Sequence, residues 1–144
     1  MRIVLQRVNN ASVLVDGEEV GSIAKGYVAY LGIAIGDTMQ TAARLADKIA
    51  RLRIFADENG KTNLSGLDVG GEILIISQFT LMADLTSNRP GFSRAAKPEQ
   101  AKELYEYFVE QCKGRFCKVA TGRFAAHMHV DSEGDGPFTL VLEG

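Results

Sequence analysis

The sequence predicts an α/β domain with a mainly antiparallel, barrel-like β-sheet core covered by two main helices. Short apolar runs bounded by turn residues recur along the chain and are typical of strands. Two longer segments have apolar residues at helical spacing. Most connections between the expected strands are short, which favours antiparallel pairing. At 144 residues and 46% hydrophobic content, we expect a single domain over residues 1–144.

Strands dominate the first part of the chain and are followed by a helix. We expect strands at residues 2–8, 11–15, 18–23 and 26–35. Asp16-Gly17 is a two-residue hairpin signal. Asp37 and Thr38 can cap the following helix. The core face of that helix should comprise Ala42, Leu45, Ala46, Ile49 and Leu52.

Further strands and a second helix make up the rest of the chain. We expect strands at residues 53–57, 72–80, 117–121, 125–131 and 137–143. Pro98 suits the first turn of the second helix. Its apolar stripe is Ala101, Leu104, Tyr105, Phe108 and Cys112. The turn-like segment EGDG, residues 133–136, predicts that the last two strands form a hairpin.

Composition and charge argue against several classes of function for this protein. A net charge of −2 argues against a protein that coats long stretches of nucleic acid, but allows one that handles an RNA end through a local basic patch. The start of the chain has only three consecutive apolar residues, Ile3 to Leu5, too few for a signal-peptide core. No apolar run reaches the length of a membrane span, so we expect a cytoplasmic protein without a membrane partner. Cys112 and Cys117 have neither redox nor zinc spacing and are expected to be free thiols.

The sequence lacks the usual cofactor and nucleophile motifs. There is no Walker loop, G-x-G-x-x-G or G-x-S-x-G segment, and we expect no cofactor. His127 and His129 alternate, so in a strand both would point to one face. A zinc site usually has at least three protein ligands. Exposed strand histidines are therefore favoured over a metal site, and no metal is expected.

Three stretches could carry chemistry. Ser77-Gln78-Phe79-Thr80 follows an apolar strand, with Ser77 and Phe79 expected on one side and Gln78 and Thr80 on the other. This is either an ordinary polar strand end or a site wall whose backbone N–H groups face an oxyanion. The loop at 88–94 has two arginines and one aromatic ring, suited to phosphate or ribose contact or simply to solvent.

The third stretch contains the dipeptide Gly136-Pro137. It is either an ordinary turn or a special backbone feature, because the cis form of an X-Pro bond costs only about 0.5–1 kcal/mol and can present carbonyls in an unusual direction.

Together these stretches resemble the D-aminoacyl-tRNA deacylase family. SQFTL at 77–81 matches its first signature, and Gly136-Pro137 with Phe138-Thr139 is similar to its second, N-x-G-P-V-T. Gly134 stands in place of the Asn and Phe138 in place of the Val, which leaves the fine geometry of this turn open. The resemblance spans the whole chain through LQRV with ASV, RIF at 53–55, NRPGFS at 88–93, LYEYFVE at 104–110 and TGRFAAHM at 121–128.

The resemblance implies hydrolysis of the ester that joins a D-amino acid, or mischarged glycine, to the 3′ end of tRNA. It also implies a homodimer in which Gly136-Pro137 of one subunit, in cis and held by Arg7, reaches into the pocket of the other. Rigid backbone carbonyls there would clash with L-amino acids whatever their side chain. Glycine would be accepted because it has no side chain to clash.

The same resemblance suggests roles at the strand end. The Phe79 or Thr80 N–H would face the oxyanion, a contact typically worth about 2.7–4 kcal/mol, and Gln78 would cap the aminoacyl group. Three routes stay open: assistance by the ribose 2′-OH, which the resemblance favours, a Thr80 acyl-enzyme that lacks an evident base, and an unassisted water. Candidate RNA contacts are Arg89, Arg94, Lys97 and Lys102.

Other functions are compatible with the same residues. A relative that clears an L-amino acid such as alanine from the wrong tRNA would hold the Gly-Pro bond in trans and have a roomier pocket. A non-catalytic protein could bind the tRNA end or associate with DNA, although the acidic composition and the lack of a basic tail argue against a DNA partner. A small-ester hydrolase would need no RNA.

Overall fold

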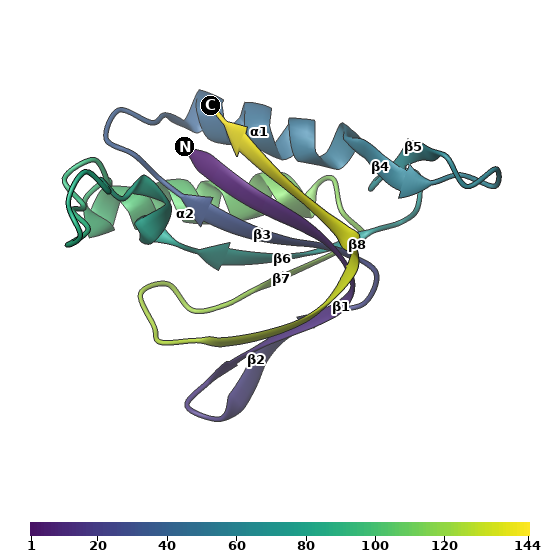
Figure 1. Ribbon diagram of the computed structural model, residues 1–144, viewed down its shortest axis with the longest axis horizontal. Coiled ribbons are helices and arrows are strands. Elements are labelled where there is room, and N and C mark those ends of the chain that lie inside the picture. Colours follow the sequence, from purple (N-terminus) through teal and green to yellow (C-terminus); the bar gives the residue numbers. More distant parts are fainter.

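A computed structural model describes residues 1–144 as a curved sheet with two helices on one face (Figure 1). The expected fold class is confirmed. The strands are β1 (Arg2–Val15), β2 (Glu18–Ile23), β3 (Gly26–Gly32), β4 (Arg53–Ala56), β5 (Thr62–Ser65), β6 (Glu72–Ser77), β7 (Lys118–Thr121) and β8 (His129–Glu143). The helices are α1 (Met39–Arg51), the short 3-10 helix η1 (Phe79–Met82) and α2 (Pro98–Lys113). No helix is both long and apolar enough to span a membrane.

Strand β1 organises the main sheet. Its first half pairs with β3, its second half with β2, and nearly its whole length with β8, all antiparallel. The pairs β3–β6 and β6–β7 are parallel, and the chain crosses between them through α1 and α2. The far ends of the sheet approach each other, because a Cβ on Gly21 of β2 would lie 2.7 Å from the Thr121 carbonyl oxygen of β7. The sheet therefore nearly closes into a barrel.

Two apolar clusters lie on opposite faces of this sheet. The larger has 23 buried residues and packs β1, β3 and β6 against both helices. The smaller, with 8 buried residues, fills the inside of the curl. The Tyr105 hydroxyl of α2 donates to the Ile75 carbonyl at 2.9 Å, which fixes the helix against β6 two residues before that strand ends.

The predicted hairpin at EGDG is wrong. Residues 129–143 form one strand, β8, instead of two strands at 125–131 and 137–143, and residues 125–128 are not strand. The predicted strands at 2–8 and 11–15 likewise merge into β1. The two long strands support each other, because β1 offers partners on both sides of EGDG and shifts in register near Val8 absorb the irregular residues. Strand β5 was not anticipated.

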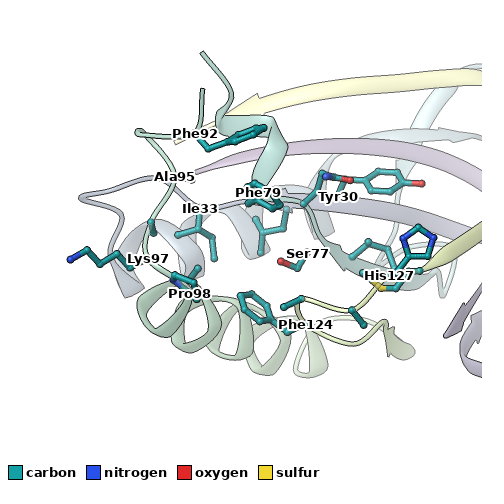
Figure 2. A pocket seen from close by; sticks show the side chains of 18 of the residues that line it. Tyr30, Ile33, Ser77, Phe79, Phe92, Ala95, Lys97, Pro98, Phe124 and His127 are labelled. Atoms are coloured by element: carbon teal, nitrogen blue, oxygen red, sulfur yellow. The ribbon is translucent and has the colours of Figure 1, made fainter. Parts of the chain in front are cut away.

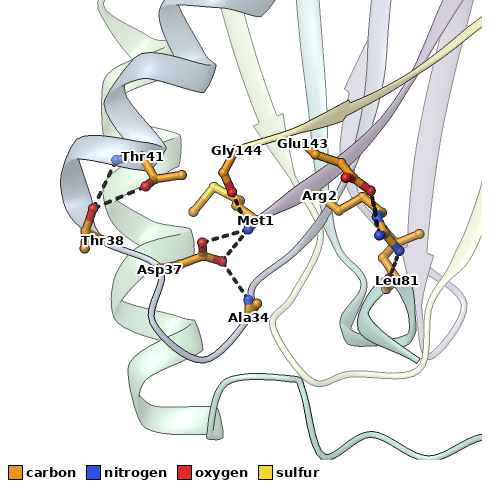
Figure 3. A network of polar contacts seen from close by, with 9 residues as sticks. All are labelled: Met1, Arg2, Ala34, Asp37, Thr38, Thr41, Leu81, Glu143 and Gly144. Atoms are coloured by element: carbon orange, nitrogen blue, oxygen red, sulfur yellow. Dashed lines mark hydrogen bonds and ion pairs between the residues drawn. The ribbon is translucent and has the colours of Figure 1, made fainter. Parts of the chain in front are cut away.

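A polar network fixes the ends of the long strands (Figure 3). Asp37 does not cap α1. Its carboxylate accepts from the Met1 ammonium group at 2.7 Å and from the Ala34 N–H at 2.7 Å. Thr38 is the N-cap and accepts from the Thr41 N–H at 3.3 Å. Arg2 pairs with Glu143 at 2.6 Å and donates to the Leu81 carbonyl at 2.8 Å, so the β1–β8 pair is tied to η1.

Candidate active site

A cavity of about 620 Å³ lies at the end of β6 (Figure 2). Fourteen of its 19 lining residues are hydrophobic. Three walls surround it: the segment Ser77–Phe79, the loop before α2 with Phe92 and Lys97, and the β7–β8 connection with Phe124 and His127. This is a concave, mainly apolar space with a few polar groups, the usual form of a small-molecule site.

Strand β6 stops at Ser77, so the strand predicted to residue 80 is too long. The Gln78 N–H donates to the Leu31 carbonyl at 2.8 Å, and the chain then turns into η1 through the bond from the Leu81 N–H to the Gln78 carbonyl at 3.3 Å. The predicted alternation therefore fails. Ser77, Gln78 and Phe79 all line the same cavity, and the Ser77 hydroxyl points into it (Figure 2).

Thr80 lies outside the cavity lining. It is exposed, and its hydroxyl accepts a hydrogen bond from the Gln78 side-chain amide. The first N–H groups of a helix have no partner within the helix. Among the backbone hydrogen bonds of turns, loops and caps, none uses the Phe79 or Thr80 N–H as donor. Of these two residues Phe79 lines the cavity, and a free backbone N–H in such a position is suited to bind an oxyanion.

An aromatic pair forms the roof of the cavity. The rings of Phe79 and Phe92 meet edge to face, with 4.9 Å between centroids, although Phe79 remains 56% exposed. Tyr30 and Phe124 also line the cavity. Burial raises the pKa of the Tyr30 hydroxyl above its ordinary value. Sequence reasoning noted Phe92 but missed Tyr30 and Phe124; the segment TGRFAAHM was the available signal for Phe124.

Gly136 and Pro137 lie elsewhere in the same chain and do not line this cavity. Their peptide bond is cis. Arg7 lies beside them with a side chain that is only 14% exposed. Its guanidinium donates to the Asp135 carbonyl at 3.2 Å and to the Ile54 carbonyl, and pairs with the Asp135 carboxylate at 3.1 Å. The structure thus joins Arg7 to this dipeptide and separates both from Ser77.

The four candidate RNA-binding residues are distributed unevenly. Lys97 lines the cavity, whereas Arg89 and Arg94 are exposed in the preceding loop. Arg94 also donates to the Ala83 carbonyl at 2.9 Å. Lys102 lies on α2 beside a second, more polar cavity of about 380 Å³, 4.0 Å from the Glu106 carboxylate. No group of three or more His, Cys, Asp or Glu side chains is arranged to hold a metal ion.

Solved structures share this fold. One, described as "c-Myc DNA Unwinding Element Binding Protein", superposes with a TM-score of 0.95 at 41% identity and covers 100% of this chain and 99% of its own. Another, described as a probable eukaryotic D-amino acid tRNA deacylase, has a TM-score of 0.87 at 16% identity, over 98% of this chain and 97% of its own. At that identity the second match shows the fold alone. The curved sheet with two helices on one face therefore has the fold of that tRNA deacylase structure.

Sequence comparison defines the family. The D-Tyr-tRNA(Tyr) deacylase family model matches residues 4–143, and the chain belongs to this family. A D-aminoacyl-tRNA deacylase of Lactobacillus delbrueckii subsp. bulgaricus is 51% identical and covers 99% of both chains. One from Thermosipho africanus is 52% identical and covers 99% of this chain and 97% of its own. The expected family relationship is confirmed.

Proposed function

We propose that the protein hydrolyses the ester between a D-amino acid and the 3′-terminal adenosine of tRNA, releasing the free amino acid and tRNA in the cytoplasm. The observation that carries this proposal is the position of Ser77-Gln78-Phe79 on the wall of the 620 Å³ cavity, in a chain of the deacylase family. The apolar walls suit an aminoacyl side chain and an adenine ring, and Lys97 suits a phosphate.

Backbone donors carry the proposed chemistry. As water attacks the ester carbonyl, negative charge develops on the carbonyl oxygen, and we expect the Phe79 or Thr80 N–H to donate to it, since neither is a donor among the backbone bonds of turns, loops and caps. The leaving ribose oxygen takes up a proton, and the neighbouring 2′-OH assists the attack. Thr80 is a poor nucleophile because its hydroxyl lies outside the cavity lining and accepts from Gln78.

We propose that selection against L-amino acids comes from the carbonyls of Gly136 and Pro137. In one chain this dipeptide does not line the cavity, so we infer that it acts on the cavity of a second copy. This supports a homodimer with sites at the interface. Glycine on tRNA would be accepted because it lacks the side chain that the carbonyls exclude, and the reaction would serve as chiral proofreading of translation.

Paired deacylation time courses on D-Tyr-tRNA and L-Tyr-tRNA with the purified protein test the proposal. We expect rapid loss of the D ester with the L ester intact. Loss of both esters would indicate a relative that clears L-amino acids from tRNA. It would also contradict the proposed selection by Gly136 and Pro137. Loss of neither would exclude the enzyme. Activity on a free D-tyrosine ester without RNA would instead favour a small-ester hydrolase.

A second candidate function is DNA association, favoured by the relative at 41% identity whose description names DNA unwinding element binding. The net charge of −2 argues against it. Fluorescence anisotropy with a labelled duplex at physiological salt tests this reading, and we expect no binding at micromolar protein.

A further inference from the structure

The two histidines of the segment AHMHV take no part in the proposed reaction, yet their rings are in contact and one of them lines the cavity. His127 belongs to the β7–β8 connection and lines the cavity, and His129 is the first residue of β8. Both side chains are exposed. Their ring centroids are 5.2 Å apart and the ring planes are inclined by 81°.

The backbone holds this pair in place. Met128, between the two histidines, packs against the smaller apolar cluster inside the curl. His129 is paired with Leu14 of β1 in the sheet. Because packing of Met128 and sheet pairing of His129 fix the backbone, only the rotations of the two side chains remain to be ordered by a ligand, which lowers the entropy cost of binding one.

The separation of the rings matches chelation of one ion. A zinc–nitrogen bond of about 2.1 Å puts the centroid of each imidazole about 3.2 Å from the metal. Two such rings at a tetrahedral angle have centroids about 5 Å apart, close to the separation of His127 and His129. Imidazole suits Zn²⁺, Ni²⁺ and Cu²⁺, whereas Mg²⁺ and Ca²⁺ prefer oxygen ligands.

We propose that His127 and His129 form a two-histidine site for a divalent transition metal ion, and that the bound ion blocks the cavity. Two protein ligands leave the remaining coordination positions to water, so binding is reversible and weaker than in a structural zinc site. An ion on His127 lies at the cavity wall with its waters and competes with the aminoacyl end of the substrate. This second part of the proposal rests on the proposed function.

Zinc titration by calorimetry, in buffer without chelator, tests the site independently of activity. We expect one Zn²⁺ per chain, and at least about tenfold weaker binding in His127→Gln and in His129→Gln, since each removes one of two ligands. Two controls test competing ligands: Asp131→Asn alters a carboxylate on the same strand, and Cys117→Ser removes the exposed thiol. Both should bind zinc like the unmodified protein. Equal affinity in the histidine variants, or loss confined to Cys117→Ser, would overturn the site.

Deacylation of D-Tyr-tRNA with and without Zn²⁺ tests whether the bound ion blocks the cavity. The rate of each variant in Zn²⁺ is compared with the metal-free rate of the same variant. Substrate incubated with Zn²⁺ but without protein serves as the blank. At saturating Zn²⁺ and subsaturating substrate, we expect the rate of the unmodified protein to fall at least about tenfold and to recover with EDTA. The rates of the histidine variants should change far less. Zinc bound at the histidines without loss of rate would overturn the block. Failure of the metal-free protein to deacylate would count against the proposed function, while the titration still decides the metal site.

Discussion

The guanidinium group of Arg7 lies over the ring of Phe138, with 4.8 Å between Cζ and the ring centroid. The same guanidinium binds the carbonyl and the carboxylate of Asp135. The residues on both sides of Gly136-Pro137 are therefore attached to one side chain, which is itself anchored to the Ile54 carbonyl. A dipeptide fixed at both ends can present its carbonyls in one direction.

Replacing Arg7 by Lys should weaken chiral selection. A lysine ammonium keeps the charge but cannot present the planar, forked donors that reach Asp135 and Ile54 together. We expect the ratio of D-Tyr-tRNA to L-Tyr-tRNA deacylation rates to fall at least about tenfold. Arg51→Lys is a matched control, because Arg51 makes only an exposed pair with Asp47 on α1. An unchanged ratio in Arg7→Lys would show that Arg7 does not hold the filter.

A tRNA ending in 2′-deoxyadenosine should distinguish the chemical routes. If the ribose 2′-OH assists attack, single-turnover hydrolysis of the D-Tyr ester on that tRNA should slow at least about a hundredfold. Thr80→Ala removes the hydroxyl but keeps the backbone N–H, so its loss of rate should be far below the roughly thousandfold or greater loss typical of a missing nucleophile. The reverse pattern would establish a Thr80 acyl-enzyme.

Gly32→Ala should disturb the site through the backbone. A Cβ at Gly32 would lie 2.8 Å from the Leu81 Cβ and 3.0 Å from the Gln78 carbonyl oxygen. Overpacking of this kind costs about 1–3 kcal/mol. We expect a lower free energy of unfolding in urea and slower D-Tyr-tRNA deacylation, because Gln78 and η1 must move.

Gly134→Ala serves as the control for stability. No atom lies within 4 Å of the Cβ that it would add. Its free energy of unfolding should stay within about 0.5 kcal/mol of the unmodified protein. A similar loss of unfolding free energy in Gly32→Ala and Gly134→Ala would show that crowding between β3 and η1 does not cause the destabilisation of Gly32→Ala.

The two thiols should differ in reactivity. Burial raises the pKa of the Cys112 thiol to about 12, so almost no thiolate forms there at neutral or mildly alkaline pH. Cys117 is exposed. With a disulfide reagent at pH 8, we expect one fast-reacting thiol per folded chain, lost in Cys117→Ser, and a second only in denaturant. Fast reaction at Cys112 would mean that α2 opens readily.

Local patterns predicted most elements but not where the long strands continue. The helices were predictable because their apolar residues repeat at helical spacing and Pro98 begins α2. Judged from the local sequence alone, the glycines on both sides of Asp135 predict a turn. They remain in β8 because the facing strand β1 supplies partners there, and that pairing joins residues more than a hundred positions apart.

The candidate site was predictable only in part, for the same reason. The segment at 77–79 was found because polar residues follow an apolar strand, and these residues do line the cavity. The alternation expected for Phe79 failed because the hydrogen bonds of Gln78 turn the chain out of the strand. Tyr30 and Phe124 reach the site because elements far apart in the sequence pack together. The periodicity of a single segment cannot predict such packing.

The pairing of β1 with β8 bears on how the protein is made. Strand β1 lies between β8 and its other neighbours, and among the strands of this fold β1 is synthesised first and β8 last. During translation, the edge of β1 that pairs with β8 therefore stays unpaired until β8 has been synthesised. Such high contact order slows folding and leaves an unpaired edge prone to aggregation. The nascent chain should therefore depend on chaperones until residues 129–143 are released.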